Sequence, residues 1–564
     1  MSTAHLQDFL GVNSELQLIL LGLVVTIIAI PAVTWLVSAA RFHSSLRHFH
    51  NAAGAKSLEP HLPPLLPYSI PVLGHSLAFL STKPGSFHRR MQRHFAAHPH
   101  VGCLSVLLAG QRTHILGNAD LIQRLFKARG VSRERFTRDI MTKANGLSLE
   151  DDFKAYVMVH PDGSTLAALN EQVNKKYLLP QSAVNVLTSQ FMKAFQQQLK
   201  LKAEAFSDKS SFKEIPLYLF VRDNMFVAST TALYGSEIFK HNPDLNELFW
   251  PFSDGTLARL FQLGRFIAPD AYNALDTILD KWEQWNKHVQ SQQMYRKLGL
   301  SERGRASYDL GFMFGLNSNA IPATGWTLCH LLQPHNAELL AQVRGEVDRA
   351  RNPADGSINI AALMGDCAYL NSCLHETMRC YVDVQITRTL TEDFTLADQY
   401  LMRKGDIIIA PSFVSHHDPG FWSSPQAPSS SPLPENVWHG ERFLKHDAAT
   451  GQVSFSTVGT TGRFFPFGGG EYLCPGRMFA KQEVFGAIAA FLSLFDVEFV
   501  EYADAPPSAS TAKAGKTDDM VATMKRKGTE ESRFPAVKQQ FTGAGTLCPD
   551  GDVLVRISRR EGVD

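Results

Sequence analysis

Apolar residues recur every three or four positions along most of the middle of the chain, and this spacing predicts helices. Clear examples lie within residues 191–206, 275–298 and 337–350. Runs with the composition of strands are short, and five of them stand out: CLSVLLA, THILG, DFTLA, DIIIAPS and DVLVRIS. The pattern therefore predicts a mainly helical fold with small β-sheets.

One apolar run near the start of the chain differs from all the others, because residues 16–40 carry no charge. At about 1.5 Å per residue, a helix of this length spans a hydrocarbon core of about 30 Å. Acidic residues precede the run and no Lys or Arg does, which is unlike a cleaved signal peptide. Arg41, Arg47 and Lys56 follow it. The positive-inside rule therefore predicts a lumenal N-terminus and a single-pass anchor, with the rest of the chain in the cytosol. The run has no Arg-rich amphipathic pattern, so we expect the endoplasmic reticulum membrane.

A proline-rich stretch, EPHLPPLLPYSIPVLGH, follows the apolar run and its basic flank. Each proline fixes φ and removes a backbone donor, so the stretch should form an extended, semi-rigid connector. We expect an anchor over 1–40, a basic and proline-rich hinge over 41–74 and a catalytic domain over 75–564.

The composition excludes several classes of protein. The 564 residues are 44% hydrophobic and 19% charged, which fits a large globular protein. Lys and Arg total 55 against 54 acidic residues, so no overall charge attracts nucleic acid. The seven cysteines form an odd set without a C-x-x-C pair, which is typical of a reduced, cytosol-facing chain.

The candidate chemistry concentrates on one cysteine, in the segment FFPFGGGEYLCPGRMF. Cys474 follows three consecutive glycines and precedes Pro475, the residue that a helix prefers at its first position. A helix N-terminus stabilises a thiolate, and glycines let the backbone approach a flat ligand closely. A thiolate presented in this way can ligate iron. For the other cysteines, the simpler interpretation as small buried hydrophobic residues holds.

The pattern Phe467-x-x-Gly470-x-x-x-Cys474-x-Gly476 resembles the cysteine-ligand loop of the cytochrome P450 superfamily, the haem-thiolate monooxygenases. The resemblance implies a single large haem domain, mainly α with small β-sheets, behind the transmembrane helix. It implies that Cys474 is the axial ligand of haem b iron and that Phe467, Gly470 and Gly476 contact the cofactor. In this family the thiolate donates electron density that favours cleavage of the O–O bond.

A second motif supports the resemblance. Glu376 and Arg379 stand three residues apart in CLHETMRCYV and so share a helix face, where the family has its Glu-x-x-Arg pair. Arg442 in WHGERFL occupies the place of the family's Pro-Glu-Arg-Phe motif. The resemblance implies a structural cluster of these three side chains. The alternative for an isolated pair of this spacing is a solvated surface bridge.

The segments QITRTLTEDFTL, GLNSNAIPATGWTL and CPGRMFA resemble the sterol 7α-hydroxylase and prostacyclin synthase branch of the superfamily. Two departures stand out. Gly440 replaces the expected Pro before Glu441, and Tyr472 stands where many members have Arg or His for a haem propionate. Arg388 should then carry more of the propionate binding, and Lys175 is a weaker candidate from the third helix.

The segment that matches the oxygen-activating helix also departs from the family. Most members have an acidic residue followed by Thr, whereas Ser318 and Asn319 stand here, so proton delivery must differ. Pro322 lacks an N–H and leaves the Ser318 carbonyl unpaired, so we expect the helix to open beside Asn319 into a groove for oxygen and water. The alternative is a kinked core helix without a catalytic role.

Taken with the resemblance, these residues predict a monooxygenase that oxidises a lipophilic substrate: sterol-like, terpenoid or a polyketide secondary metabolite. No convincing G-x-G-x-x-G fingerprint binds nicotinamide, so NADPH should supply electrons through a partner, NADPH-cytochrome P450 reductase. Two alternatives stay open: a reductase-independent peroxide isomerase or dehydratase of the prostacyclin synthase type, and a non-catalytic haem- or sterol-binding sensor.

Overall fold

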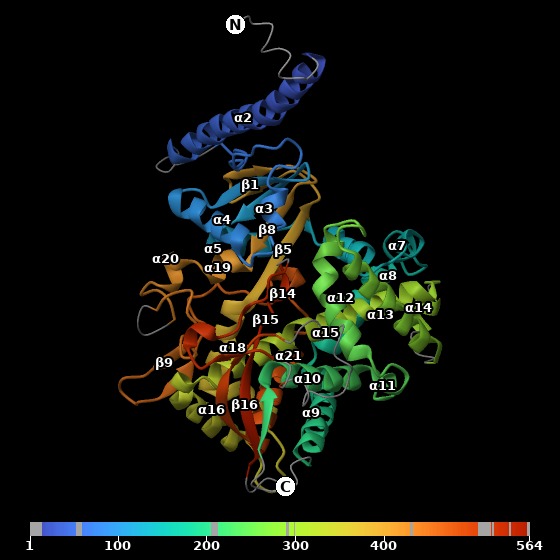
Figure 1. Ribbon diagram of the computed structural model, residues 1–564, viewed down its shortest axis with the longest axis vertical. Coiled ribbons are helices and arrows are strands. Elements are labelled where there is room, and N and C mark those ends of the chain that lie inside the picture. The colour runs from blue at the N-terminus through green and yellow to red at the C-terminus, as the bar shows by residue number, and fades with distance from the viewer. Residues whose placement is uncertain are drawn as a thin grey trace, which may run out of the picture. The chain divides into compact units, whose positions relative to one another are not determined.

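The computed structural model describes residues 14–51, 59–204, 212–288, 293–297, 299–428, 433–505, 521, 524–540 and 543–560. The predicted lumenal N-terminus and Lys56 lie outside these residues. The fold is mainly helical with small sheets, as predicted (Figure 1). The chain forms two compact units: the first is Met1–Ser81, Ser86–Ser132 and Ile386–Ala410, and the second is Thr82–Gly85, Arg133–Gln385 and Pro411–Asp564. The boundaries of the expected domains stay predictions.

The first unit is built on a small sheet from three of the predicted strands. Strand β1 (Cys103–Leu108) pairs antiparallel with β2 (Gln111–Leu116), and β2 pairs parallel with β8 (Ile407–Pro411). The other elements of this unit are α3 (Ser76–Phe79), α4 (Ser86–Ala97), α5 (Ala119–Lys127), β3 (Val131–Ser132), β6 (Phe394–Leu396), β7 (Tyr400–Met402) and the second half of β5 (Val382–Leu390).

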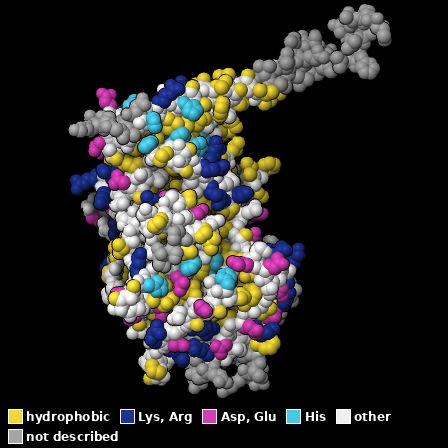
Figure 2. Space-filling view, turned by 90° about the vertical axis from the view of Figure 1, so that its left-hand side faces the viewer, with side chains coloured by type: hydrophobic (Ala, Val, Ile, Leu, Met, Phe, Trp, Pro, Cys, Tyr) yellow, Lys and Arg dark blue, Asp and Glu magenta, His cyan; other side chains and the backbone are white. Residues whose placement is uncertain are grey.

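Helix α2 (Ser14–Asn51) contains the predicted anchor and continues beyond residue 40. Its stretch Thr26–His50 is long and apolar enough to cross a membrane. Exposed apolar side chains gather along the described middle of this helix, from Ile27 to Val37 (Figure 2). Its last turns pack into the first unit, because Phe42 and Phe49 are buried and the Phe49 ring stacks on Tyr400 at 5.1 Å. The basic flank is therefore helical and partly packed.

The proline-rich connector is extended over residues 59–68, whereas residues 69–75 turn, so the predicted extension up to Gly74 holds only in part. β1 holds the extended part near its middle. Leu66 donates its N–H to the Ser105 carbonyl at 2.9 Å, and Ser105 donates to the Pro64 carbonyl at 2.8 Å. Prolines suit this place because only alternate N–H groups along an edge need a partner. The connector thus adds a short strand-like edge to the first unit.

The second unit holds most of the helices and a large apolar core. Helix α16 (Ala337–Ala350) matches its predicted range, and the described residues of the predicted helix at 275–298 belong to α13 (Pro269–His288) and α14 (Gln293–Lys297). The remaining helices are α6 (Glu134–Asp139), the π-helix η1 (Ile140–Ala144), α7 (Leu149–Tyr156), α8 (Leu166–Leu178), α9 (Gln181–Glu204), α10 (Leu217–Tyr234), α11 (Glu237–His241), α12 (Leu245–Leu260), α13 (Pro269–His288), α14 (Gln293–Lys297), α15 (Glu302–Leu331), η2 (Pro334–Asn336), α17 (Ile360–Gly365), α18 (Ala368–Tyr381), α19 (Ser412–His416), α20 (Pro419–Trp422), η3 (Gly470–Tyr472), α21 (Arg477–Leu494) and η5 (Glu531–Arg533).

The strands of the second unit come largely from the C-terminal part of the chain. Four of them form one sheet in the order β12-β11-β16-β4, and β14 pairs antiparallel with the start of β5. Helices α15, α18 and α21 share one apolar core with α9 and α10. The strands are β4 (Lys213–Pro216), β9 (Leu444–His446), β10 (Val453–Phe455), β11 (Phe495–Ala503), β12 (Arg526–Gly528), β13 (Ala536–Val537), β14 (Ala544–Thr546), β15 (Pro549–Asp550) and β16 (Asp552–Arg559).

The packing of α2 generates a stability prediction. Phe49 is 1% exposed and Trp35 is 50% exposed on the same helix. We expect Phe49→Ala to cost about 3–5 kcal/mol and to lower the Tm of the detergent-solubilised protein, because it leaves a cavity against Tyr400. Trp35→Ala is the matched control and should leave the Tm unchanged. Equal Tm values for the two variants would contradict the packing of α2 into the first unit.

Candidate functional site

The loop before α21 presents Cys474 on a tightly turned backbone. Its N–H donates to the Phe467 carbonyl at 3.0 Å, which closes the loop. Gly468 and Gly470 have φ of 78° and 68°, a left-handed conformation that favours glycine. The helix begins at Arg477, so Pro475 precedes it rather than occupying its first position. Cys474 nevertheless lies directly before the helix N-terminus, as the sequence predicts.

The electrostatics of the Cys474 thiol differ from the expectation. Burial raises its pKa above the ordinary value, and this effect outweighs a hydrogen bond from the Gly476 backbone and the positive charges of Arg133 and Arg477. The helix N-terminus and the neighbouring charges therefore do not by themselves outweigh the effect of burial on this thiol. A bound metal ion would supply the missing stabilisation, because it favours the deprotonated ligand.

Glu376 and Arg379 lie on α18 and meet Arg442 in a fully buried ion-pair cluster. All three side chains are 0% exposed. Arg379 binds the carboxylate through two nitrogens, Nε at 2.7 Å and Nη2 at 2.8 Å, and Arg442 Nε donates to it at 2.9 Å. The alternative of a solvated surface bridge is excluded by this burial, and the predicted cluster is confirmed.

Two guanidinium groups share one carboxylate in this cluster, so further acceptors are needed. Main-chain carbonyls supply them: Arg379 donates to those of His416 and Glu435, and Arg442 donates to those of Trp422, Leu433, Pro434 and Val437. Burial alone would raise the pKa of Glu376, but the charges and hydrogen bonds of the two arginines outweigh it and hold that pKa below its usual range. The cluster therefore ties α18 to residues 416–442.

On α15, Ser318 and Asn319 make bonds that the sequence did not suggest. The helix is continuous through Pro322, so the expected opening does not interrupt it. The Ser318 hydroxyl donates to the Phe314 carbonyl at 2.6 Å, and Asn319 Nδ2 donates to the Ser318 hydroxyl at 3.3 Å. Asn319 Oδ1 accepts the N–H of Thr546 at 3.0 Å, from a residue 227 positions away. No local pattern in the sequence points to this partner.

Comparison with known proteins shows to which protein family these residues belong. The family model described as cytochrome P450 matches residues 310–520, which include α15, α18 and the Cys474 loop. This chain belongs to the cytochrome P450 family.

Relatives of this P450 extend the match along most of the chain. The cytochrome P450 monooxygenase fsoE of Humicola fuscoatra is 25% identical and covers 94% of each chain. The cytochrome P450 monooxygenase calL of Penicillium decumbens is 27% identical over 69% of this chain and 71% of that protein. The cholesterol 7-alpha-monooxygenase of Cricetulus griseus is 26% identical over 80% of this chain and 90% of that protein. The protein is a monooxygenase, and its predicted resemblance to the sterol 7α-hydroxylase branch is confirmed.

The P450 family implies a haem iron with a cysteine thiolate ligand, and the described residues fit such a group. The glycines of the Cys474 loop place no side chain over the sulfur: a Cβ on Gly476 would lie 4.0 Å from Cys474 Sγ. On α15, Gly315 lies one turn before Asn319 and is exposed, whereas the helix is buried from Ala320 to its end. A Cβ there would meet nothing within 4 Å, so this face of the helix leaves room for a flat ligand.

The two predicted propionate residues lie in different surroundings. Lys175 on α8 pairs with Glu171 at 2.7 Å, and the charges of Glu471 and Tyr472 add to that pairing in raising its pKa. Its ammonium group is therefore near the Cys474 loop. Arg388 is buried on the part of β5 in the first unit, where its guanidinium donates to the Thr387 carbonyl at 2.9 Å. Their propionate contacts stay predictions.

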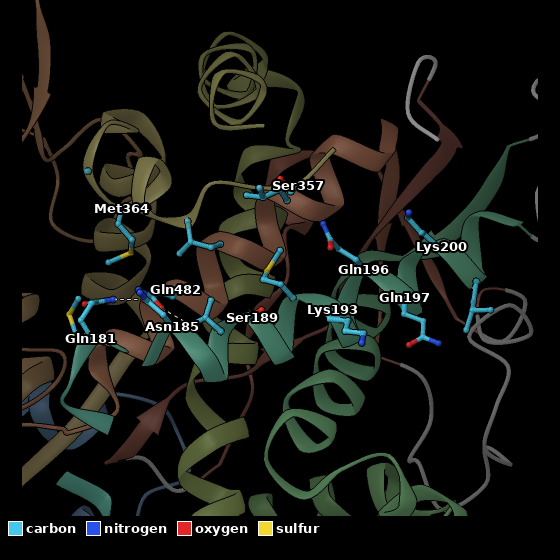
Figure 3. Close-up of a pocket in the computed structure, with 18 of the residues that line it drawn as sticks. Gln181, Asn185, Ser189, Lys193, Gln196, Gln197, Lys200, Ser357, Met364 and Gln482 are labelled. Atoms are coloured by element: carbon cyan, nitrogen blue, oxygen red, sulfur yellow. Dashed lines mark hydrogen bonds between the residues drawn. The ribbon is translucent and has the colours of Figure 1, made fainter. Parts of the chain in front are cut away.

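The second unit has a small cavity beside α15 and an open groove beside α21. A cavity of about 50 Å³ lies beside Ser318 and Phe314, with the segment Gly543–Cys548 as a wall. An open groove of about 1200 Å³ lies between α9, α17 and α21 (Figure 3). Gln181, Asn185 and Gln482 form a hydrogen-bonded row of amides along it. The small cavity adjoins the predicted oxygen-activating residues.

The buried ion-pair cluster generates a second prediction. Glu376→Ala or Arg379→Ala should cost about 3–5 kcal/mol, because each leaves a buried charge without its partner. We expect little haem-loaded protein and a lower Tm for both variants. Glu237 and Lys240 have the same spacing on the surface, so Glu237→Ala is the matched control and should change stability by less than about 0.5 kcal/mol. Normal haem content in Glu376→Ala would show that the cluster is dispensable.

Proposed function

We propose that this P450 is a membrane-anchored haem-thiolate monooxygenase with Cys474 as its axial ligand. One observation carries the proposal. The loop that matches the family's ligand motif holds Cys474 directly before α21, and the Gly476 backbone N–H forms a hydrogen bond with the Cys474 sulfur. A haem bound there supplies the activation of dioxygen and the transfer of one oxygen atom to a C–H bond.

The chain's own groups have separate tasks in this proposal. The Gly476 backbone and the charges of Arg133 and Arg477 stabilise negative charge on the sulfur. Phe467, Gly470 and Gly476 shape the loop around the ligand, while Arg388 and Lys175 are the candidates for the haem propionates. On α15, the hydroxyl of Ser318 and the amide of Asn319 form a short polar chain that can pass a proton or orient a water molecule.

We further propose a lipophilic substrate that is sterol-like, a terpenoid or a polyketide secondary metabolite. The names of relatives support the class, since one is a cholesterol 7-alpha-monooxygenase and others are fungal P450 monooxygenases. The small cavity has a mixed lining, with Leu257, Phe314 and Leu547 beside polar residues such as Asp254 and Thr256. The substrate class therefore rests on the relatives.

We propose that α2 anchors the protein in the endoplasmic reticulum membrane, with the catalytic residues in the cytosol. The apolar helix and the basic residues after it support this orientation. Electrons would come from NADPH through a membrane-bound reductase. The reductase and this P450 would then lie in the same membrane. The peroxide-rearranging alternative needs neither NADPH nor reductase.

The ligand assignment is tested on the iron spectrum. Cys474→Ser should abolish the roughly 450 nm Soret band of the reduced CO complex, because only a thiolate opposite CO produces it. Cys548 is half-buried as well, so Cys548→Ser is the control and should keep the band. An unchanged band in Cys474→Ser would remove Cys474 from the ligand role.

The reaction class is tested in membranes that contain the full chain. We expect sterol or terpenoid probes to gain one oxygen atom from labelled O2, only when both NADPH and reductase are present. Membranes with Cys474→Ser are the matched control. Rearrangement of a fatty endoperoxide at full rate without NADPH and reductase would instead support the isomerase.

A further inference from the structure

The segment of residues 543–548 forms one wall of the small cavity beside Ser318. Its central part is β14, which pairs antiparallel with the start of β5: Ala544 faces Val384 and Thr546 faces Val382. These pairings bind only one edge of the segment. Further contacts join it to side chains of α15, to the Tyr381 carbonyl at the end of α18 and to the Lys538 N–H.

The contact between Trp326 and Leu547 is reinforced by neighbouring interactions. Trp326 Nε1 donates to the Leu547 carbonyl at 2.7 Å, and the Leu547 N–H donates to the Tyr381 carbonyl at 2.8 Å. The Trp326 ring stacks on Tyr381 at 4.0 Å with an angle of 4° between their planes. The segment is therefore fixed at Leu547 by two hydrogen bonds and a stacked aromatic pair.

The other contact depends on a single side chain. Asn319 Oδ1 accepts the Thr546 N–H at 3.0 Å, while its Nδ2 donates to Ser318, which fixes the orientation of the amide. Gly545 lies directly against the same oxygen: a Cβ there would be 2.2 Å from Asn319 Oδ1. Only glycine at 545 therefore permits this bond in its observed geometry.

The closed position of the segment limits what the cavity can hold. The cavity is about 50 Å³, and residues 543–548 line it together with Phe314 and Ser318. Sites for drug-sized ligands are roughly 300–1,000 Å³. A sterol-sized molecule can enter at this place only if the wall moves. β14 is held to β5 by strand pairing, and on the side of α15 Leu547 is held by Trp326 and Thr546 by Asn319. The wall can therefore part from α15 at the Asn319 contact while its pairing with β5 is kept.

We propose that Asn319 and Gly545 form a latch that holds residues 543–548 closed and thereby selects substrates by size. Asn319 is in this respect a positioning residue that acts through Thr546. The proposal rests on the proposed function in placing the substrate beside α15. The latch stabilises the closed arrangement, so a large ligand must break the Asn319–Thr546 hydrogen bond, whereas a small one need not.

The first test measures the latch without any turnover, by hydrogen exchange of backbone amides in the haem-loaded full-length protein. Asn319→Ala should speed exchange in residues 543–548 at least fivefold, while Asn319→Asp keeps an acceptor for the Thr546 N–H and should restore slow exchange. Ser318→Ala is the comparison variant: it removes the bond that orients the Asn319 amide but keeps the Oδ1 acceptor for Thr546, so exchange should rise less than in Asn319→Ala. Exchange around Glu376 in each variant checks that the fold is intact.

A double-substitution cycle tests the contact itself. Gly545→Ala should speed exchange in the segment, because its Cβ displaces Asn319 Oδ1. The same substitution in the Asn319→Ala background should add little, since the obstructing amide is gone. Full additivity of the two substitutions would overturn the latch. Unchanged exchange in Asn319→Ala would also overturn it.

Selection by size is measured with two azole probes that shift the Soret band. Imidazole is small and clotrimazole is bulky. Releasing the latch in Asn319→Ala should tighten clotrimazole binding about fivefold, the worth of one net hydrogen bond, and leave imidazole binding within twofold. Equal changes for both probes would overturn selection by size. Loss of the 450 nm band in Cys474→Ser bears on the proposed function alone, so the two proposals can fail separately.

Discussion

The buried cluster of Glu376, Arg379 and Arg442 is the constraint on which the rest of the second unit depends. Three fully buried charges are tolerable only when every hydrogen-bonding position is filled, because an unpaired charge in the interior is strongly destabilising. The main-chain carbonyls that fill these positions belong to one stretch of the chain that begins at His416 and ends at Val437. The cluster therefore holds the described residues of this stretch, in which α20 is the regular element, in one conformation against α18.

This constraint reaches the Cys474 loop through a short series of hydrogen bonds. Arg379 donates to the His416 carbonyl at 3.0 Å, and the His416 ring accepts the Phe465 N–H at 3.0 Å. The Phe465 carbonyl then accepts the Gly468 N–H at the start of the loop. Burial lowers the pKa of His416 to about 3, so its ring stays neutral and keeps an acceptor nitrogen. The position of the proposed ligand thus follows from the ion cluster.

The other side of the proposed site depends on α15 and on the C-terminal part of the chain. Trp326 and Asn319 each bind the backbone of residues 543–548, and Gly545 allows the close approach. The polar residues that replace the family's usual pair therefore serve both proposals. In the proposed function they offer a proton path through Ser318, and in the structure Asn319 also binds the Thr546 backbone in the wall of the cavity.

The sequence by itself determined the helical periodicity, the long apolar helix near the N-terminus, the Cys474 motif and the shared helix face of Glu376 and Arg379. These features are local, so spacing and residue type suffice to predict them. Only the tertiary structure decided that burial raises the pKa of Cys474, that α2 packs through Phe49 and that Asn319 bonds to Thr546. Desolvation and contacts between residues 227 positions apart depend on how the chain folds back on itself, and no local pattern encodes that.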